Sequence, residues 1–389
     1  MPLLVLLLLV LVFIAAALWW WQVRVPRVVP WRSTTHGGVA MQRADGLVLQ
    51  HDDGRVVWAT QGYAIYRSVD GSSFRRVARV RPPVGEAWGG YLRALRRRYG
   101  YQELVELVPL RGTPADAATR LVVLAGGAVH QLTIGSRRVR RTMRLRYFGR
   151  GRGRGLMAFG IDQAPDGALY FAEYVTESGP HPTGVWRSDD DGSSWTLAWE
   201  FEPDAVRHIH LAQVDPRDGA LWIGTGDRDE HCYIGASHDG GTTFEWVGHG
   251  QQIHRTCAVV CFAECVLWAT DADFEQNYVV RWQRDGKELE LASELPDVAY
   301  YASRIDDHRA LLGLAQDHAA VWVTDDRGRA VPWLHWPVSP SPPPRGPSGG
   351  VRLARGSNVT GPHVHVNPLR TIPHEAVILR IAREAVPVP

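Results

Sequence analysis

Apolar residues recur along most of this chain in short runs that alternate with turn-forming residues. Typical runs are 104–110 (LVELVPL), 120–127 (RLVVLAGG) and 128–135 (AVHQLTIG). Runs of this length that are rich in Val, Leu and Ile and bounded by Gly or Asp predict β-strands. We therefore expect an all-β fold made of many short strands.

One turn sequence occurs three times. The copies read Ser68-Val-Asp-Gly-Ser-Ser-Phe74, Ser188-Asp-Asp-Asp-Gly-Ser-Ser-Trp195 and Ser237-His-Asp-Gly-Gly-Thr-Thr-Phe244. Each copy lies between two short apolar runs, so each predicts a hairpin turn. In such a turn the Ser hydroxyl and Asp carboxylate can hydrogen-bond backbone groups, Gly supplies a positive φ, and the aromatic ring packs beneath the sheet. The residues expected in these structural roles are Ser68, Asp70, Gly71, Ser188, Asp190, Gly192, Trp195, Ser237, Asp239, Gly241 and Phe244.

This turn sequence resembles the Asp-box (BNR) repeat of sialidase-like β-propellers. Asp190 and Asp239 lie 49 positions apart, close to the ~40–50 residues of one four-stranded propeller blade. The interval of 120 positions from Asp70 to Asp190 leaves room for one blade without the turn. The resemblance and the spacing predict a propeller of seven four-stranded antiparallel blades, with six as the alternative.

The strand pattern divides residues 23–389 into one propeller domain. The expected blades span 46–80, 104–145, 156–201, 208–248, 256–291, 298–336 and 350–383. The last blade is the poorest, and we expect it to borrow a strand from 23–35. A Pro-rich segment, 337–350, cannot continue a sheet and is expected to form a surface loop. Residues 86–98 are expected to form a basic helical insert.

The first 22 residues differ from the rest of the chain. Residues 2–21 carry no charge, and as a helix they would cross ~30 Å of hydrocarbon, with Trp19–Trp21 at the interface. They predict a transmembrane anchor or an uncleaved signal, with a cleavable signal peptide ending near Ala15–Ala17 as the alternative. The arginines that follow would retain the propeller in the cytoplasm, but a long folded domain can translocate regardless of such charges. We expect a single-pass membrane protein whose propeller is extracytoplasmic.

Charge and cysteine content limit the possible partners. The 43 basic and 41 acidic residues give a formal net charge of +2, which argues against a nucleic-acid-binding protein. Any basic site must therefore be local. Cys232, Cys257, Cys261 and Cys265 could form disulfides, but their spacing is not that of a zinc motif, so they are treated as structural.

The resemblance implies where a ligand would bind. In propellers of this kind the Asp-boxes lie opposite the usual ligand face, which is built by connections between blades and by second-to-third strand loops. The candidates in the connections are Arg154, Arg207, His208, His210, His254, Arg255 and Tyr300. The candidates in the second-to-third loops are Glu173, Asp227, Glu230, His231 and Asp271.

The chemistry of these candidates favours an anionic ligand, because guanidinium groups bind carboxylate or sulfate through paired hydrogen bonds. A glycoside hydrolase would use two of the acidic residues. A uronate lyase would instead need a base and a cation, and His210, Tyr300, Arg207 and Arg255 offer both. Histidines beside carboxylates could also hold a divalent metal, although no spacing is diagnostic.

We therefore expect a membrane-tethered propeller that binds and cleaves an acidic carbohydrate, with His210, Glu230 and Tyr300 in catalysis and the other candidates in ligand binding. Sialidase activity is not expected, because its Arg-Ile-Pro motif has only a faint echo in Arg24-Val25-Pro26. The alternative function is non-enzymatic, as an assembly factor or a protein-binding scaffold.

Overall fold

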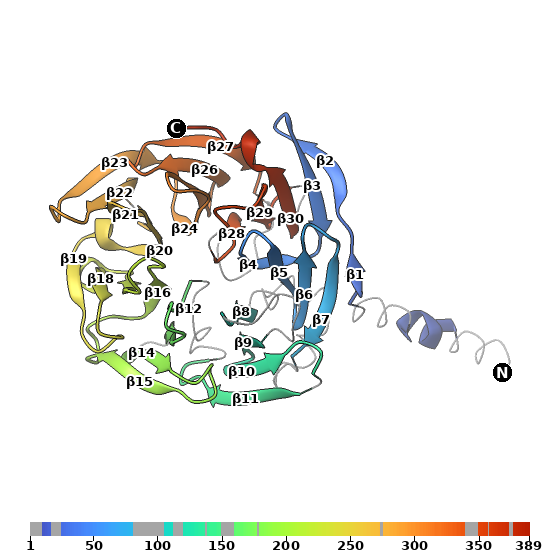
Figure 1. Ribbon diagram of the computed structural model, residues 1–389, viewed down its shortest axis with the longest axis horizontal. Coiled ribbons are helices and arrows are strands. Elements are labelled where there is room, and N and C mark those ends of the chain that lie inside the picture. The colour runs from blue at the N-terminus through green and yellow to red at the C-terminus, as the bar shows by residue number, and fades with distance from the viewer. Residues whose placement is uncertain are drawn as a thin grey trace.

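A computed structural model describes residues 10–16, 25–80, 105–111, 120–136, 138–148, 159–176, 179–272, 275–338, 349–356, 358–372 and 376–389. Seven antiparallel sheets are arranged in a ring around a central axis (Figure 1). The prediction of a seven-bladed all-β propeller is confirmed, and the six-bladed alternative is wrong. Arg154, the expected insert at 86–98 and residues 339–348 of the Pro-rich segment lie outside the described residues.

Each of the first six blades is built from consecutive strands. The first consists of β4 (Val48–Asp52), β5 (Val56–Gln61), β6 (Ala64–Val69) and β7 (Phe74–Arg79). The second consists of β8 (Val105–Pro109), β9 (Arg120–Ala125), β10 (Ala128–Thr133) and β11 (Val139–Arg144). The third consists of β12 (Ile161–Gln163), β13 (Leu169–Ala172), β14 (Thr183–Ser188) and β15 (Thr196–Phe201).

The next three blades follow the same plan. The fourth consists of β16 (Ile209–Val214), β17 (Leu221–Thr225), β18 (Tyr233–Ser237) and β19 (Glu245–His249). The fifth consists of β20 (Thr256–Cys261), β21 (Cys265–Thr270), β22 (Asn277–Gln283) and β23 (Leu289–Leu295). The sixth consists of β24 (Ala299–Arg304), β25 (Arg309–Leu314), β26 (Ala319–Asp325) and β27 (Ala330–Trp336). Short 3₁₀ helices occur at η3 (Asp229–His231), η4 (Gln252–His254) and η5 (Arg383–Ala385).

The seventh blade joins the two ends of the chain. Its strand order is β28 (Gly350–Leu353), β29 (His363–Leu369), β30 (Val377–Ala382), β3 (Val39–Asp45) and β2 (Arg32–His36). Strand β3 pairs directly with β30, with Met41 opposite Ile381, and β2 pairs with β3 at the edge. The blade therefore takes two strands from the N-terminal part of the chain, and one of them, β2, comes from the expected segment 23–35. Met41 is buried beside Ile381 in the core of this blade, whereas β2 is mostly exposed at the edge. The two-residue β1 (Val28–Val29) pairs instead with β7 of the first blade.

Stacking of blade against blade explains the continuous apolar strands. Strands β17 and β21 are buried along their whole length, because each sheet is covered on both faces by its neighbours. Trp58, Trp222, Trp268 and Trp336 are among the largest fully buried side chains. The hydrophobic core therefore lies between blades.

The three repeated turns all connect the third and fourth strands of a blade. In the third blade the Ser188 hydroxyl lies 2.9 Å from a carboxylate oxygen of Asp190, and that carboxylate accepts a 2.8 Å hydrogen bond from the Ser194 amide. Ser237 and Asp239 make the same bonds in the fourth blade. The first-blade turn differs, because Asp70 has a φ of 47° and its carboxylate lies 3.4 Å from Nε of Arg55.

The propeller has two distinct faces. Innermost strands begin at the start face, where connections between blades and second-to-third loops meet, and they end at the hairpin face, which carries the three repeated turns.

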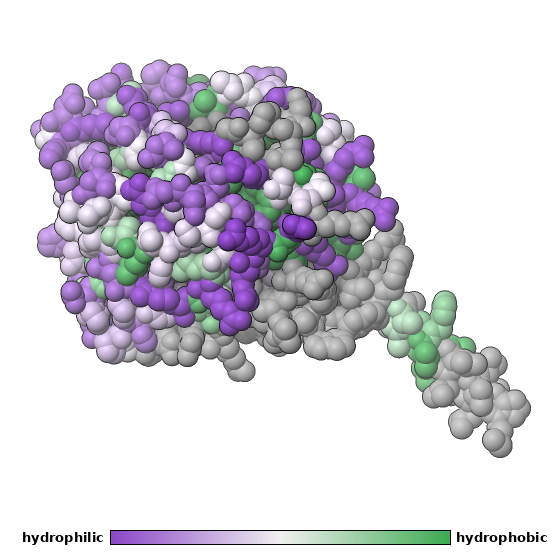
Figure 2. Space-filling view, turned by 60° about the horizontal axis from the view of Figure 1, so that its bottom comes forward, coloured by the Kyte–Doolittle hydropathy of each residue, from purple (hydrophilic) through white to green (hydrophobic). Residues whose placement is uncertain are grey.

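The membrane prediction is corrected by the structure. Within the residues described, no helix is long and apolar enough to cross a membrane. Residues 10–16 are helical and appear as an apolar segment beside a largely hydrophilic propeller surface (Figure 2). The rest of the predicted 1–22 span lies outside the described residues.

Candidate active site between the fourth and fifth blades

Two histidines lie where the innermost strand of the fourth blade begins. His208 and His210 alternate along this segment and are both 2% exposed, as expected for positions two apart on a strand. Nδ1 of His208 donates a 2.6 Å hydrogen bond to the Val175 carbonyl. Its ring stacks on Tyr174, with centroids 4.0 Å apart. His208 is therefore held against the third blade.

Asp227 follows strand β17 and comes near three basic side chains, those of Arg207, His208 and Arg255. Its carboxylate accepts a 2.7 Å hydrogen bond from Nη1 of Arg207, and its Oδ1 lies 3.3 Å from Nε2 of His208 and 3.6 Å from Nη2 of Arg255. Burial would raise the pKa of Asp227, but His208, His210 and Arg207 outweigh it and hold this pKa well below its usual range. Asp227 is thus a carboxylate at neutral pH.

The fifth blade adds three more residues. Nδ1 of His210 lies 3.6 Å from Sγ of Cys257 and 3.6 Å from Oδ2 of Asp271, and the Cys257 Sγ lies 3.4 Å from the same oxygen. Nε of Arg255 is 3.2 Å from Oδ2 of Asp271. We call His208, His210, Asp227, Arg255, Cys257 and Asp271 the interblade cluster.

A glycine permits this close approach. A Cβ atom on Gly226 would lie 2.6 Å from Cγ of Arg255 and 2.9 Å from Cε1 of His210. Contacts this short are not tolerated, so a larger residue would displace one of the two side chains. The backbone of β17 and its following loop therefore sets the distance between the imidazole and the guanidinium.

Burial controls the proton state of the cluster. Burial, with the nearby His208 and Arg255, holds the pKa of His210 well below its usual value, so its imidazole is neutral at neutral pH. Burial and the Asp271 carboxylate raise the pKa of Cys257 well above its usual range. The cluster thus combines a neutral imidazole, a thiol and two carboxylates beside a guanidinium.

Among the residues that the structure describes, two sets could hold a metal ion, because the candidate ligand atoms within each set lie within 4.8 Å of one another. They are His208–His210–Asp227 and His210–Cys257–Asp271. The second set fits better. Its three atoms are separated by 3.4–3.6 Å, and a tetrahedral ion with bonds of about 2.0–2.3 Å separates its ligands by about 3.3–3.7 Å. The sequence spacing had hidden this set, since its members come from three separate segments.

The other candidates lie away from the cluster. Glu173 is buried, but its carboxylate is bound by Arg146 and by the Gly184 amide. Glu230 is exposed in η3, with Nη1 of Arg228 3.8 Å away. His231 is in η3 and His254 in η4, and the Tyr300 hydroxyl accepts a 3.0 Å hydrogen bond from Gln316 in the sixth blade.

Two residues of this site, Cys257 in the cluster and Tyr174 beside it, are not among the candidates predicted from the sequence. Cys257 was regarded as structural, although it follows Arg255 by two positions just as His210 follows His208, a signal that both pairs point the same way. Tyr174, whose ring stacks on His208, belongs to no motif of the sequence that marks it for this role. All four cysteines are free thiols, so neither of the two possible disulfides forms.

Comparisons with known proteins support the fold. No family model and no curated protein matches the chain. An oligogalacturonate lyase in complex with manganese is similar with a TM-score of 0.53 and 10% identity, covering 92% of this chain and 97% of that one. An oligogalacturonate lyase from Vibrio parahaemolyticus has a TM-score of 0.55 and 7% identity, covering 92% and 98%.

A third similar structure is a puromycin-hydrolyzing peptidase of Mycobacterium tuberculosis, with a TM-score of 0.50 and 14% identity, covering 83% of this chain and 49% of that one. At such identities the likeness shows the propeller fold alone.

Proposed function

We propose that the interblade cluster holds a divalent transition-metal ion and, together with its arginines, binds the carboxylate of an acidic carbohydrate for a lyase-type reaction. The observation that carries this proposal is the triangle of Nδ1 of His210, Sγ of Cys257 and Oδ2 of Asp271, with a guanidinium against it. Nitrogen, sulfur and oxygen donors at these separations match a metal with one position left for a ligand.

The donor types select among metals. Thiolate and imidazole together favour zinc-like ions, whereas manganese prefers oxygen ligands. A bound ion would attract the ligand's carboxylate and stabilise negative charge that develops beside it. One similar lyase is in complex with manganese, which supports a divalent ion in a propeller of this shape. Because Cys257 offers a sulfur ligand, we expect an ion that binds sulfur better than manganese does, such as zinc.

The arginines supply the anion-binding part of the site. Arg207 has 46% of its side chain exposed, and Asp227 has 25%, so this pair forms the part of the site that a ligand can meet first. Arg255 lies deeper, with 8% of its side chain exposed. A carboxylate bound by these guanidinium groups would replace part of their contact with Asp227 and would be held by charge-assisted hydrogen bonds.

The state of the carboxylates favours a lyase over a hydrolase. A glycoside hydrolase needs one carboxyl group that keeps its proton near neutral pH. Asp227 is held ionised by its cationic neighbours, and Glu173 is bound to Arg146. A uronate lyase instead needs cations at the sugar carboxylate, which this site provides. The two similar lyases named for oligogalacturonate support a uronate as the acidic sugar.

The test is product formation from oligogalacturonides by the full chain, with zinc or manganese added. Elimination creates a carbon–carbon double bond conjugated to the carboxylate, which absorbs ultraviolet light, whereas hydrolysis creates none. We expect this absorbance with oligogalacturonides and none with uncharged galacto-oligosaccharides. His210→Ala should abolish it, and His318→Ala, at an exposed histidine of the sixth blade, should not.

Two other results of this experiment would change the proposed function. New reducing ends without the absorbance would replace the lyase with a hydrolase. If neither sugar binds, and if the His210→Ala variant still binds a protein partner as the parent protein does, the scaffold alternative is favoured and the proposal is overturned.

A further inference from the structure

A second site lies on the propeller axis at the opposite face. The innermost strands of all seven blades end around a cavity of about 370 Å³, within the size range of small-molecule pockets. Strand β16 reaches it through Gln213 and Val214. Since Val214 follows His210 by four residues, the strand separates the two by about 13 Å. The cavity therefore opens at the hairpin face and is distinct from the interblade cluster.

The charged residues that line this cavity are mainly cationic. They are Arg67, Arg111, Arg304, Arg355, Asp53 and Asp162. Both aspartates are engaged by backbone amides, since Asp53 accepts hydrogen bonds from Arg55 and Val56, and Asp162 accepts one from Val214. Four arginines thus face two carboxylates that already have amide donors, and the cavity has excess positive charge.

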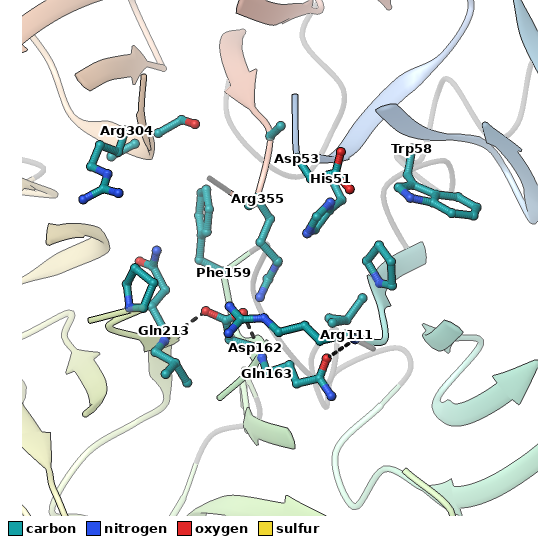
Figure 3. A pocket seen from close by; sticks show the side chains of 18 of the residues that line it. His51, Asp53, Trp58, Arg111, Phe159, Asp162, Gln163, Gln213, Arg304 and Arg355 are labelled. Atoms are coloured by element: carbon teal, nitrogen blue, oxygen red, sulfur yellow. Dashed lines mark hydrogen bonds between the residues drawn. The ribbon is translucent and has the colours of Figure 1, made fainter. Parts of the chain in front are cut away.

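Arg355 is the most deeply placed of these cations, with 5% of the residue exposed. Its guanidinium carbon lies 5.5 Å from the centre of the Phe159 ring. Figure 3 shows Arg355 and His51 extending side by side from neighbouring blades toward the middle of the cavity, with Arg111 reaching in from another side. Burial lowers the pKa of His51, so its ring adds no charge at neutral pH.

The backbone holds Arg355 in this position. The Arg355 amide donates a 3.1 Å hydrogen bond to the Gln50 carbonyl, and the Arg355 carbonyl accepts a 2.8 Å hydrogen bond from the Asp52 amide. The next residue, Gly356, has a φ of 100°, and a Cβ there would lie 2.6 Å from the Asp52 carbonyl oxygen. Only glycine permits this turn. The guanidinium is thus fixed before any ligand arrives, which lowers the entropy cost of binding.

Apolar side chains complete the wall. Phe159, Leu110, Val214, Val259 and Val260 line the cavity and can pack against a hydrocarbon or a planar ring. A fully hydrated inorganic ion would gain nothing from them, whereas an organic anion would use both the cations and the apolar wall. A monocarboxylate with an apolar body matches this combination and the small volume.

We propose that this axial cavity binds a small organic carboxylate, with Arg355 and Arg304 as the anion-binding residues and Phe159 against the apolar body. This site is independent of the interblade cluster. It needs no metal, and it places a ligand where the first, third, sixth and seventh blades meet.

The experiment is isothermal titration calorimetry of the full chain with benzoate and hexanoate, each compared with its uncharged amide. We expect both carboxylates to bind at least about tenfold more tightly than their amides, because a hydrogen bond to a charged group contributes more than a neutral one. Arg355→Gln and Arg304→Gln should each weaken carboxylate binding by about tenfold or more. Arg141→Gln, at an exposed arginine of the edge strand β11, is the matched control and should change nothing.

Two further results decide the matter. His210→Ala should leave benzoate binding unchanged, and loss of binding in that variant would place the carboxylate at the interblade cluster and overturn the proposal. Equal binding of acid and amide, or binding of neither, would also overturn it. Should Arg355→Gln fail to fold, Arg304→Gln still tests the site, because Arg304 is only half-buried and its guanidinium donates one long hydrogen bond of 3.3 Å to the Cys261 carbonyl.

Discussion

The Asp52 carboxylate accepts a 2.7 Å hydrogen bond from Nδ1 of His365, and this bond joins the first blade to the last. Asp52 ends strand β4 and His365 lies in β29. Only 4% and 7% of their side chains are exposed. The pair therefore strengthens the closure of the ring at the place where the two ends of the chain meet.

His365→Ala should destabilise the protein by about 3 kcal/mol, because it leaves the buried Asp52 carboxylate without the imidazole that donates a hydrogen bond to it. Chemical denaturation would measure the change in the free energy of unfolding. His363→Ala, two positions earlier on the same strand, is the control and should cost clearly less. Equal losses for the two variants would show that the pair has no special role in closure.

The same pair predicts a pH dependence. Burial would raise the pKa of Asp52, but the charge and hydrogen bond of His365 outweigh it and lower this pKa below its unfolded value. A lowered carboxyl pKa adds stability above the unfolded value and loses it as the pH falls through the folded value. Unfolding free energy should therefore fall below about pH 4, and less steeply in His365→Ala. If the unfolding free energies of the parent protein and of His365→Ala fall in parallel as the pH is lowered, the Asp52–His365 pair is not the origin of the pH dependence.

The repeated turns should differ in their contribution to stability. Asp190→Ala and Asp239→Ala remove carboxylates that accept backbone hydrogen bonds, so each should lower the thermal midpoint of unfolding. For Asp190→Ala the free energy of unfolding should fall by about 1 kcal/mol. Asp70→Ala is the matched comparison and should have little effect, because its exposed carboxylate faces Arg55. A large loss for Asp70→Ala would mean that all three turns act alike.

Metal binding can be measured without any substrate. Cobalt(II) added to the full chain should produce a thiolate-to-metal charge-transfer band, and Cys257→Ser should abolish it. Cys265→Ser is the control, because the buried Cys265 thiol lies outside the cluster and donates a hydrogen bond to the Asp326 carbonyl. Because burial raises the pKa of Cys257, binding should release a proton, detectable by calorimetry in buffers of different ionisation enthalpy. Retention of the band in Cys257→Ser would exclude the proposed ligand set.

Arg255→Ala should weaken an acidic sugar by about 2–5 kcal/mol and should also lower the melting temperature. The second effect follows because Asp271, 2% exposed, would lose the guanidinium 3.2 Å away. Arg207→Ala should weaken the sugar while leaving the melting temperature nearly unchanged, since about half of that side chain is exposed. Calorimetry and thermal melts of both variants separate binding from folding.

The sequence by itself determined the architecture. Short apolar runs and a turn repeated at blade spacing are local signals, and each blade makes most of its hydrogen bonds with neighbours in sequence. Such signals placed the first six blades nearly correctly. The same reasoning was incomplete where the outcome depends on distant segments. It placed an N-terminal strand in the last blade, as β2 is, but it missed β3, which pairs directly with β30 and shares a core with it through Met41 and Ile381.

Only the tertiary structure decided which polar residues act together. His210 and Cys257 lie 47 positions apart, yet their side chains meet because adjacent innermost strands begin at the same face. The sequence predicted Glu230 in catalysis and Glu173 in ligand binding, but Arg146 binds the Glu173 carboxylate, and Glu230 is mostly exposed near Arg228. The axial cavity has no sequence motif, because its lining comes from seven strand ends. A strand pattern specifies local pairing, whereas the distance between side chains on different blades is set by how the ring closes.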